Sequence, residues 1–168
     1  MTACPECGAA LPPGRACLDY FHELLALEAQ VPGAPGAEPH FLAVAAYNLQ
    51  HPSAFVPAAL VGLLQTVADV LAGRATVADA RRRARRATDG PTQVRRRADT
   101  PLSEADGRLL GAWPTRWAMT VRDVSEVTPE QYVAQVQAWA RCVTVGLERA
   151  PAPPGSGSTI ATTPEREP

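Results

Sequence analysis

One short stretch near the N-terminus constrains this chain more than any other, because its cysteines are spaced as metal ligands. Cys4 and Cys7 flank a Pro-Glu pair, and Gly8 follows directly. Two intervening residues let a tight turn aim both sulfurs at one point, and glycine tolerates the backbone angles of such a turn. The pattern predicts a zinc knuckle that anchors the otherwise irregular first residues.

Beyond the knuckle, apolar residues recur at the three- and four-residue spacing of amphipathic helices, and prolines or glycines separate the segments. We expect helices at 18–30, 39–50, 57–72, 76–88, 120–124 and 128–149, whereas 92–117 is ambiguous, with a stretch at 92–95 that could be extended. The predicted fold is mainly α: one small domain of about five helices over 1–149, with the N-terminal zinc knuckle at 1–22. Residues 150–168, rich in Pro, Gly, Ser and Thr, predict a disordered tail.

Cys17 and His22 lie close enough in sequence to the knuckle to complete a tetrahedral site. We therefore predict Cys4, Cys7, Cys17 and His22 as the ligands of a zinc ion. Within a continuous helix, residues five apart point about 140° away from each other. The pairing of Cys17 with His22 consequently requires Cys17 to lie at or before the start of its helix.

The fourth ligand stays open between His22, His51 and a water molecule. If the first two helices form an antiparallel hairpin, His22 and His51 lie at the same end, and His40 lies at the other end near Glu28. His40 and His51 are separated by about 16 Å along an unbroken helix, so they cannot share one ion. We expect His40 to be a helix-start residue without a role in the site.

Composition sets the compartment and limits the partners. A length of 168 residues suits one domain, and a net charge of −1 argues against a bulk electrostatic partner. No apolar run approaches the roughly 18 residues of a membrane span, and the N-terminus has no signal-peptide pattern. We expect a cytoplasmic protein with reduced thiols, in which the N-terminal cysteines serve as metal ligands. We expect Cys142, in the last helix, to be a small packed side chain.

The coordination number decides what such a zinc does. Four protein ligands make a structural site, which we favour, with a role in interaction or regulation through a protein partner. Three cysteines completed by water would instead make a metal-dependent enzyme with a site near His22, Tyr47 and His51. The sequence contains no nucleophile elbow, phosphate loop or H-E-x-x-H signature.

A second alternative is nucleic-acid binding through the segment from Arg81 to Arg97. All sixteen basic residues of the chain are arginine, which is typical of a GC-rich genome and weakens the argument from their number. No aromatic residue lies between 56 and 112, so these charges have no base-stacking platform among them. We favour a solvated helix face.

The runs Cys4–Gly8 (CPECG), Phe21–Leu25 (FHELL) and Leu49–Ser53 (LQHPS) resemble a family of small bacterial proteins known only as a domain of unknown function. The resemblance extends over about residues 4–149. It implies a cytoplasmic bacterial protein with a Cys/His-rich N-terminal part, and it brings no activity with it.

Overall fold

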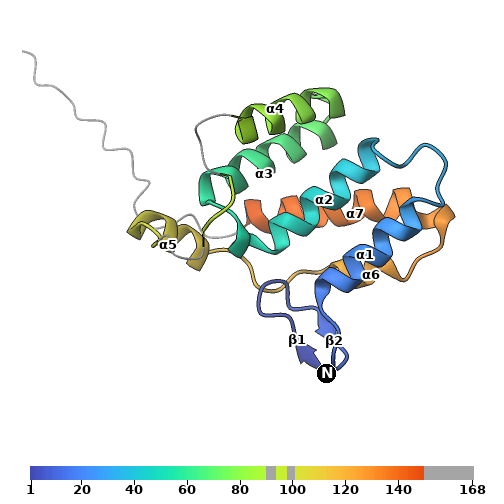
Figure 1. Ribbon diagram of the computed structural model, residues 1–168, viewed down its shortest axis with the longest axis horizontal. Helices are drawn as coiled ribbons and strands as arrows, with labels where there is room; N and C mark the ends of the chain where they lie inside the picture. Colours follow the sequence, from blue (N-terminus) through green and yellow to red (C-terminus); the bar gives the residue numbers. More distant parts are fainter. Residues whose placement is uncertain (90–93, 98–100, 150–168) are drawn as a thin grey trace, which may run out of the picture.

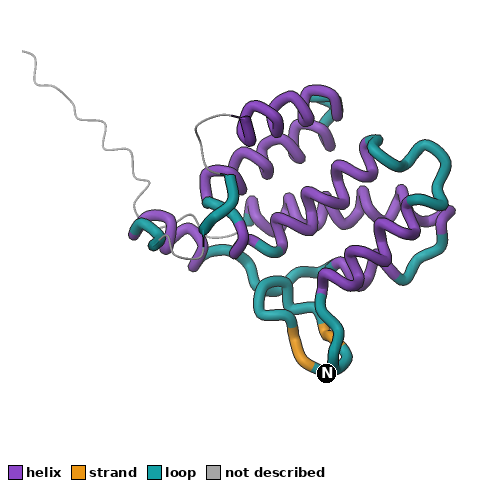
Figure 2. Tube along the Cα trace, viewed as in Figure 1, coloured by secondary structure: helices purple, strands orange, loops and turns teal. Residues whose placement is uncertain are grey.

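Helices dominate the computed structural model, which describes residues 1–89, 94–97 and 101–149. Seven α-helices and one short 3-10 helix occur in this part of the chain, with a two-stranded sheet at the N-terminus (Figure 2). The predicted mainly α fold with an N-terminal knuckle is confirmed. The elements are β1 (Thr2–Ala3), β2 (Ala10–Leu11), α1 (Cys17–Glu28), α2 (Glu38–Gln50), η1 (Pro52–Ala54), α3 (Pro57–Leu71), α4 (Val77–Asp89), α5 (Glu104–Gly111), α6 (Val121–Ser125) and α7 (Pro129–Glu148).

The core forms where α2 lies along α7 (Figure 1). One apolar face of α7 is buried, as the helical periodicity predicts, with Val136 and Trp139 fully inaccessible to solvent. On α2, Ala45 and Ala46 are almost completely buried, and their small side chains allow the two backbones to approach closely. α1 and α6 pack on one side of this pair, and α3 carries α4 on the other (Figure 1).

A polar anchor fixes the end of α2, from which the candidate site is built. Gln50 is fully buried, donates a 2.7 Å hydrogen bond to the Met119 carbonyl and accepts one of 3.2 Å from the Trp139 indole. The Trp113 indole donates to the carbonyl of Leu49 at 2.7 Å. Buried polar groups need such partners, so these bonds hold the 113–119 segment against the C-terminal end of α2.

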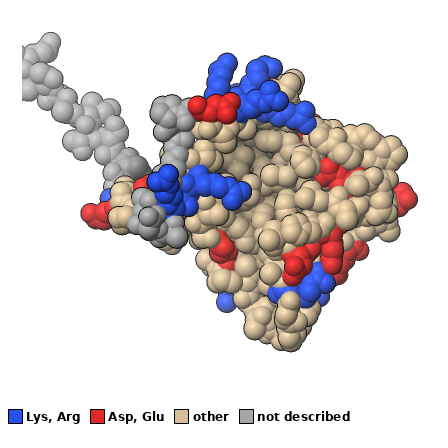
Figure 3. Space-filling view, in the orientation of Figure 1, with Lys and Arg blue, Asp and Glu red and all other residues tan. Residues whose placement is uncertain are grey.

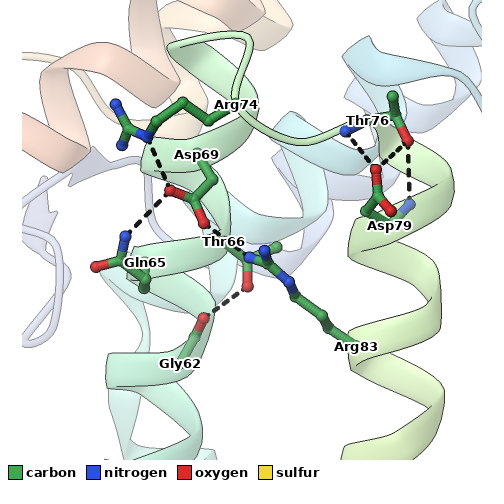
Figure 4. A network of polar contacts seen from close by, with 8 residues as sticks. All are labelled: Gly62, Gln65, Thr66, Asp69, Arg74, Thr76, Asp79 and Arg83. Atoms are coloured by element: carbon green, nitrogen blue, oxygen red, sulfur yellow. Dashed lines mark hydrogen bonds and ion pairs between the residues drawn. The ribbon is translucent and has the colours of Figure 1, made fainter.

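Charged side chains join α4 to α3, as Figure 4 shows. The Asp69 carboxylate on α3 accepts hydrogen bonds from Arg83 of α4 at 2.8 Å and from Arg74 in the connecting turn at 3.1 Å. α4 begins after Thr76, which forms a capping box: its hydroxyl accepts from the Asp79 backbone N–H, and its own N–H donates to the Asp79 carboxylate.

The ambiguous 92–117 region contains a helix that periodicity does not reveal. Ser103 caps α5, and its hydroxyl accepts a 3.1 Å hydrogen bond from the Asp106 backbone N–H. Upstream, residues 94–96 pair in extended conformation with 54–56, because the Val56 N–H donates to the Val94 carbonyl and the Arg96 N–H to that of Ala54.

Two predictions fall on residues outside the described ranges. They are the first half of the extended stretch at 92–95 and the disordered tail at 150–168. Of the helices in the described ranges, none is both long enough and apolar enough to cross a bilayer.

Candidate metal site

Three cysteines and one histidine meet between the N-terminal hairpin and the start of α1. The sulfurs of Cys4, Cys7 and Cys17 and a ring nitrogen of His51 all lie within 4.8 Å of one another. The Cys7 and Cys17 sulfurs are 3.5 Å apart, and Cys4 Sγ is 3.8 Å from His51 Nε2. Tetrahedral zinc with these ligands would have sulfur–sulfur separations of about 3.8 Å and sulfur–nitrogen separations of about 3.6 Å. The four donors therefore fit a tetrahedral ion.

The knuckle that presents the first two sulfurs is a backbone turn closed by hydrogen bonds. The Gly8 N–H donates to the Cys4 carbonyl and the Cys4 N–H to the Ala9 carbonyl, both at 2.9 Å. Gly8 has φ +73°, and a Cβ at that position would lie 2.9 Å from the Thr115 carbonyl oxygen. Only glycine combines this conformation with so close a contact.

Cys17 is the first residue of α1, preceded by Ala16 in extended conformation. Cys17 therefore lies at the helix start, but within α1 and not before it. The backbone N–H of Ala16 donates a 2.7 Å hydrogen bond to the Asp19 carboxylate, which fixes this end of the helix. Cys7 and Cys17 are both buried, whereas Cys4 and His51 are partly exposed.

His51 is held with its Nε2 edge toward the sulfurs. Its Nδ1 lies 2.8 Å from the backbone carbonyl of Tyr47, which makes Nδ1 the donor and leaves Nε2 as the free lone pair. This arrangement, in which the second ring nitrogen donates to a protein acceptor, is the usual support of a metal-bound histidine. The Glu6 carboxylate accepts a 2.9 Å hydrogen bond from the Ser53 N–H and ties the knuckle to the same segment.

The His51 ring is the end of a stack of three rings, in which Tyr47 lies between His51 and Phe21. The Tyr47 ring lies 4.2 Å from that of His51 and 4.2 Å from that of Phe21 on α1, with interplanar angles of 27° and 21°. Offset aromatic contacts of this kind restrict ring rotation. The stack therefore fixes the orientation of His51 from both α1 and α2.

Contacts within the cluster shift the pKa values of its members. The contact between the Cys7 and Cys17 sulfurs lowers the pKa of Cys7 and raises that of Cys17. Burial lowers the pKa of His51, but its contacts with Cys7 and the Tyr47 carbonyl outweigh burial and raise it overall. Burial, followed by electrostatic contact with the neighbouring cysteines, raises the pKa of Tyr47. A cation at this point would favour the deprotonated thiolates that bind it.

His22, predicted from sequence as the fourth ligand, is not one of the four clustered residues. It is exposed on α1. Because Cys17 is itself helical, His22 is rotated by about 140° around the axis from it. His51, the alternative that the hairpin argument raised, is the histidine that lies beside the sulfurs. A ligand role for His22 stays a prediction.

The remaining candidate residues lie away from the cluster. His40 is at the other end of the α1–α2 pair, as expected, with Nδ1 3.0 Å from a Glu28 carboxylate oxygen. Cys142 is half-buried on α7 and is not one of the four clustered residues.

The arginines of α4 gather on one surface of the molecule, which Figure 3 shows in blue above α3. Two of them are engaged by acids, Arg82 by Asp79 and Arg83 by Asp69. These ion pairs are consistent with a solvated face of α4 on which arginines form structural contacts.

Comparison with known proteins identifies a family whose function is unknown. No curated protein and no solved structure matches the chain. Residues 2–147 match the family described as "Family of unknown function (DUF5946)". The match takes in the knuckle, all four clustered residues and α7 up to its last turn. The chain therefore belongs to this family of unknown function, DUF5946.

Proposed function

We propose that this chain is a zinc-binding protein in which Cys4, Cys7, Cys17 and His51 hold a structural ion. The observation that carries the proposal is the convergence of four donor atoms within 4.8 Å from three separate elements. Three cysteine sulfurs and one imidazole nitrogen, close enough to surround one tetrahedral ion, favour zinc. Magnesium and calcium instead take oxygen ligands. The supporting bond from His51 Nδ1 to the Tyr47 carbonyl adds to this choice.

The proposed role of the ion is to clasp the N-terminal hairpin to the helical body. The first two sulfurs come from the knuckle, the third from the start of α1, and the nitrogen from the residue after α2. The hairpin itself has only two pairs of strand residues, Thr2 with Leu11 and Ala3 with Ala10. So small a sheet is not stable alone, and the metal would supply the missing stabilisation.

A structural site fits better than a catalytic one because four protein donors leave tetrahedral zinc no open position for substrate. The metal-dependent enzyme alternative would need one of these donors to leave the ion. We place the biological role in interaction or regulation with a protein partner, in a reducing compartment such as the cytoplasm that keeps the three thiols free.

Metal analysis of the purified full chain tests the proposal directly. We expect one zinc per chain, and X-ray absorption should give three sulfur neighbours at about 2.3 Å and one nitrogen at about 2.0–2.1 Å. A protein without stoichiometric zinc overturns the proposal, and three sulfur neighbours with one oxygen and no imidazole nitrogen would favour the catalytic alternative.

Limited trypsin digestion tests the clasp. Arg15 lies between β2 and α1 and is half-buried. Chelation should accelerate cleavage after Arg15 far more than cleavage after Arg108 in α5, which serves as the internal control. Equal acceleration at both bonds, or none at either, would contradict the clasp.

A further inference from the structure

A groove lies between the segment Arg116–Ala118 and one face of α7. Its volume is about 370 Å³, which is within the lower range of small-molecule sites, roughly 300–1,000 Å³. The lining combines apolar surface from Trp117 and Val145 with several cationic side chains.

Among the described residues, the charged side chains that line the groove are all of one sign. They are Arg116, Arg141 and Arg149, with no aspartate or glutamate from this part of the chain. None of the three forms an ion pair with another residue that the structure describes, in contrast to Arg83 and Arg74, which share Asp69. The C-terminal carbonyls of α7 attract Arg149, but this explains neither Arg116 nor Arg141. Guanidinium groups without counter-ions around a concave surface favour anion binding.

The indole of Trp117 forms one wall of the groove. Its Nε1 is buried and has no hydrogen-bond acceptor within the described part of the chain, although buried donors normally find one. The ring lies directly on the backbone of α7, since a Cβ at Gly146 would be 2.9 Å from Trp117 Cζ3. The absence of a side chain at Gly146 is what allows this flat apolar wall.

We propose that this groove binds an organic phosphate. The arginines Arg116, Arg141 and Arg149 would bind the phosphate oxygens, because guanidinium donors match a group with several oxygens and more than one negative charge. The organic part would lie against the Trp117 indole and Val145. None of the residues that line the groove is among the four clustered donors of the candidate metal site.

The indole N–H signals of ¹⁵N-labelled full-length protein provide the test, since the chain has three tryptophans. The Trp117 signal is assigned with Trp117→Phe, and ADP, inorganic pyrophosphate and adenosine are titrated at constant ionic strength. We expect ADP to shift the Trp117 signal saturably while the Trp113 and Trp139 signals, whose N–H groups already bond Leu49 and Gln50, move little. Pyrophosphate should bind more weakly than ADP, and adenosine should not saturate.

Arginine variants test whether the phosphate of ADP binds in the groove. Arg141→Gln should weaken ADP binding by about tenfold to a hundredfold, the effect of losing a hydrogen bond to a charged group. Arg85→Gln, on the exposed face of α4, removes the same charge elsewhere and should leave binding unchanged. Circular dichroism verifies that both variants fold. A non-saturating Trp117 shift, equal binding of adenosine and ADP, or equal loss in the two variants would overturn the proposal.

Discussion

The Tyr132 hydroxyl donates a 2.7 Å hydrogen bond to the Glu28 carboxylate across 104 residues of sequence. Glu28 is almost completely buried at the end of α1, and Nδ1 of His40 lies 3.0 Å from its carboxylate. A carboxylate removed from water needs such partners. This contact therefore joins α1, α2 and α7 at the end of the molecule opposite the metal site.

Replacement of Tyr132 by phenylalanine should destabilise the protein, because the buried carboxylate loses a donor that water does not replace. We expect a loss of about 1–3 kcal/mol in the free energy of unfolding, measured with urea. Tyr20→Phe is the matched control, since Tyr20 is buried but its hydroxyl has no hydrogen-bond partner within the described residues. Equal losses in the two variants would show that the Glu28 contact contributes nothing.

Exchange of single histidines should identify the fourth metal ligand. His51→Ala removes the nitrogen that lies among the sulfurs, so zinc stoichiometry or affinity should fall sharply. His22→Ala changes an exposed side chain on α1, and zinc binding should be retained. Both variants are compared by metal analysis after competition with a chromophoric chelator. The reverse result would establish the sequence-based ligand set with His22.

A methyl group at Gly8 should damage the knuckle through two separable effects. Gly8 and Gly14 both have positive φ, 73° and 78°, so alanine at either costs about 1–2 kcal/mol of backbone strain. Only at Gly8 would the new Cβ meet another atom, the Thr115 carbonyl oxygen at 2.9 Å, while nothing lies within 4 Å at Gly14. Gly8→Ala should thus lower the thermal midpoint more than Gly14→Ala, and equal shifts would disprove a close contact.

The Asp69 contacts should give stability that depends on pH. Hydrogen bonds from Arg83 first, and then from Arg74, hold the pKa of Asp69 below its usual value. A lowered folded-state pKa contributes stability above the unfolded value of about 3.9, and this contribution disappears as pH falls through the folded pKa.

Thermal unfolding of the Asp69→Asn variant from pH 7 to pH 2 tests this dependence. The difference from the original protein should be constant at neutral pH and shrink toward zero at acid pH. Glu148→Gln loses the same charge at an exposed position with no ion pair in the described residues, and its difference should stay small throughout. A difference for Asp69→Asn that does not change with pH would refute the contribution of its ionised form.

Local patterns were sufficient to predict most helices and the three cysteines that the structure brings together. The Cys-x-x-Cys spacing and the condition on Cys17 depend on turn and helix geometry, which neighbouring residues determine. The choice between His22 and His51 could not be made locally, because a hairpin brings both to the same end. The choice depends on the side of α1 that faces the cysteines. Because Cys17 is helical, His22 on the same helix points away from it, whereas His51 approaches from the end of α2.

The unpredicted features depend on contacts between distant segments or on weak local signals. α5 has only eight residues, too few for a clear periodicity, and its Ser103 cap is its main signature. The fully buried Gln50 is polar, so a hydrophobic pattern cannot assign it to the core. Its partners Met119 and Trp139 lie 69 and 89 residues away.

The spacing of the clustered residues gives a bound metal the character of a cross-link in the unfolded chain. A link between Cys17 and His51 encloses a loop of about 34 residues, for which the chain-entropy model of disulfides gives about 4 kcal/mol. All four donors are present once the first 51 residues have been synthesised, long before α7 leaves the ribosome. An ion bound at that stage would join α1 to α2 early. The α1–α2 pair would then be in place before α7 packs against α2 and completes the core.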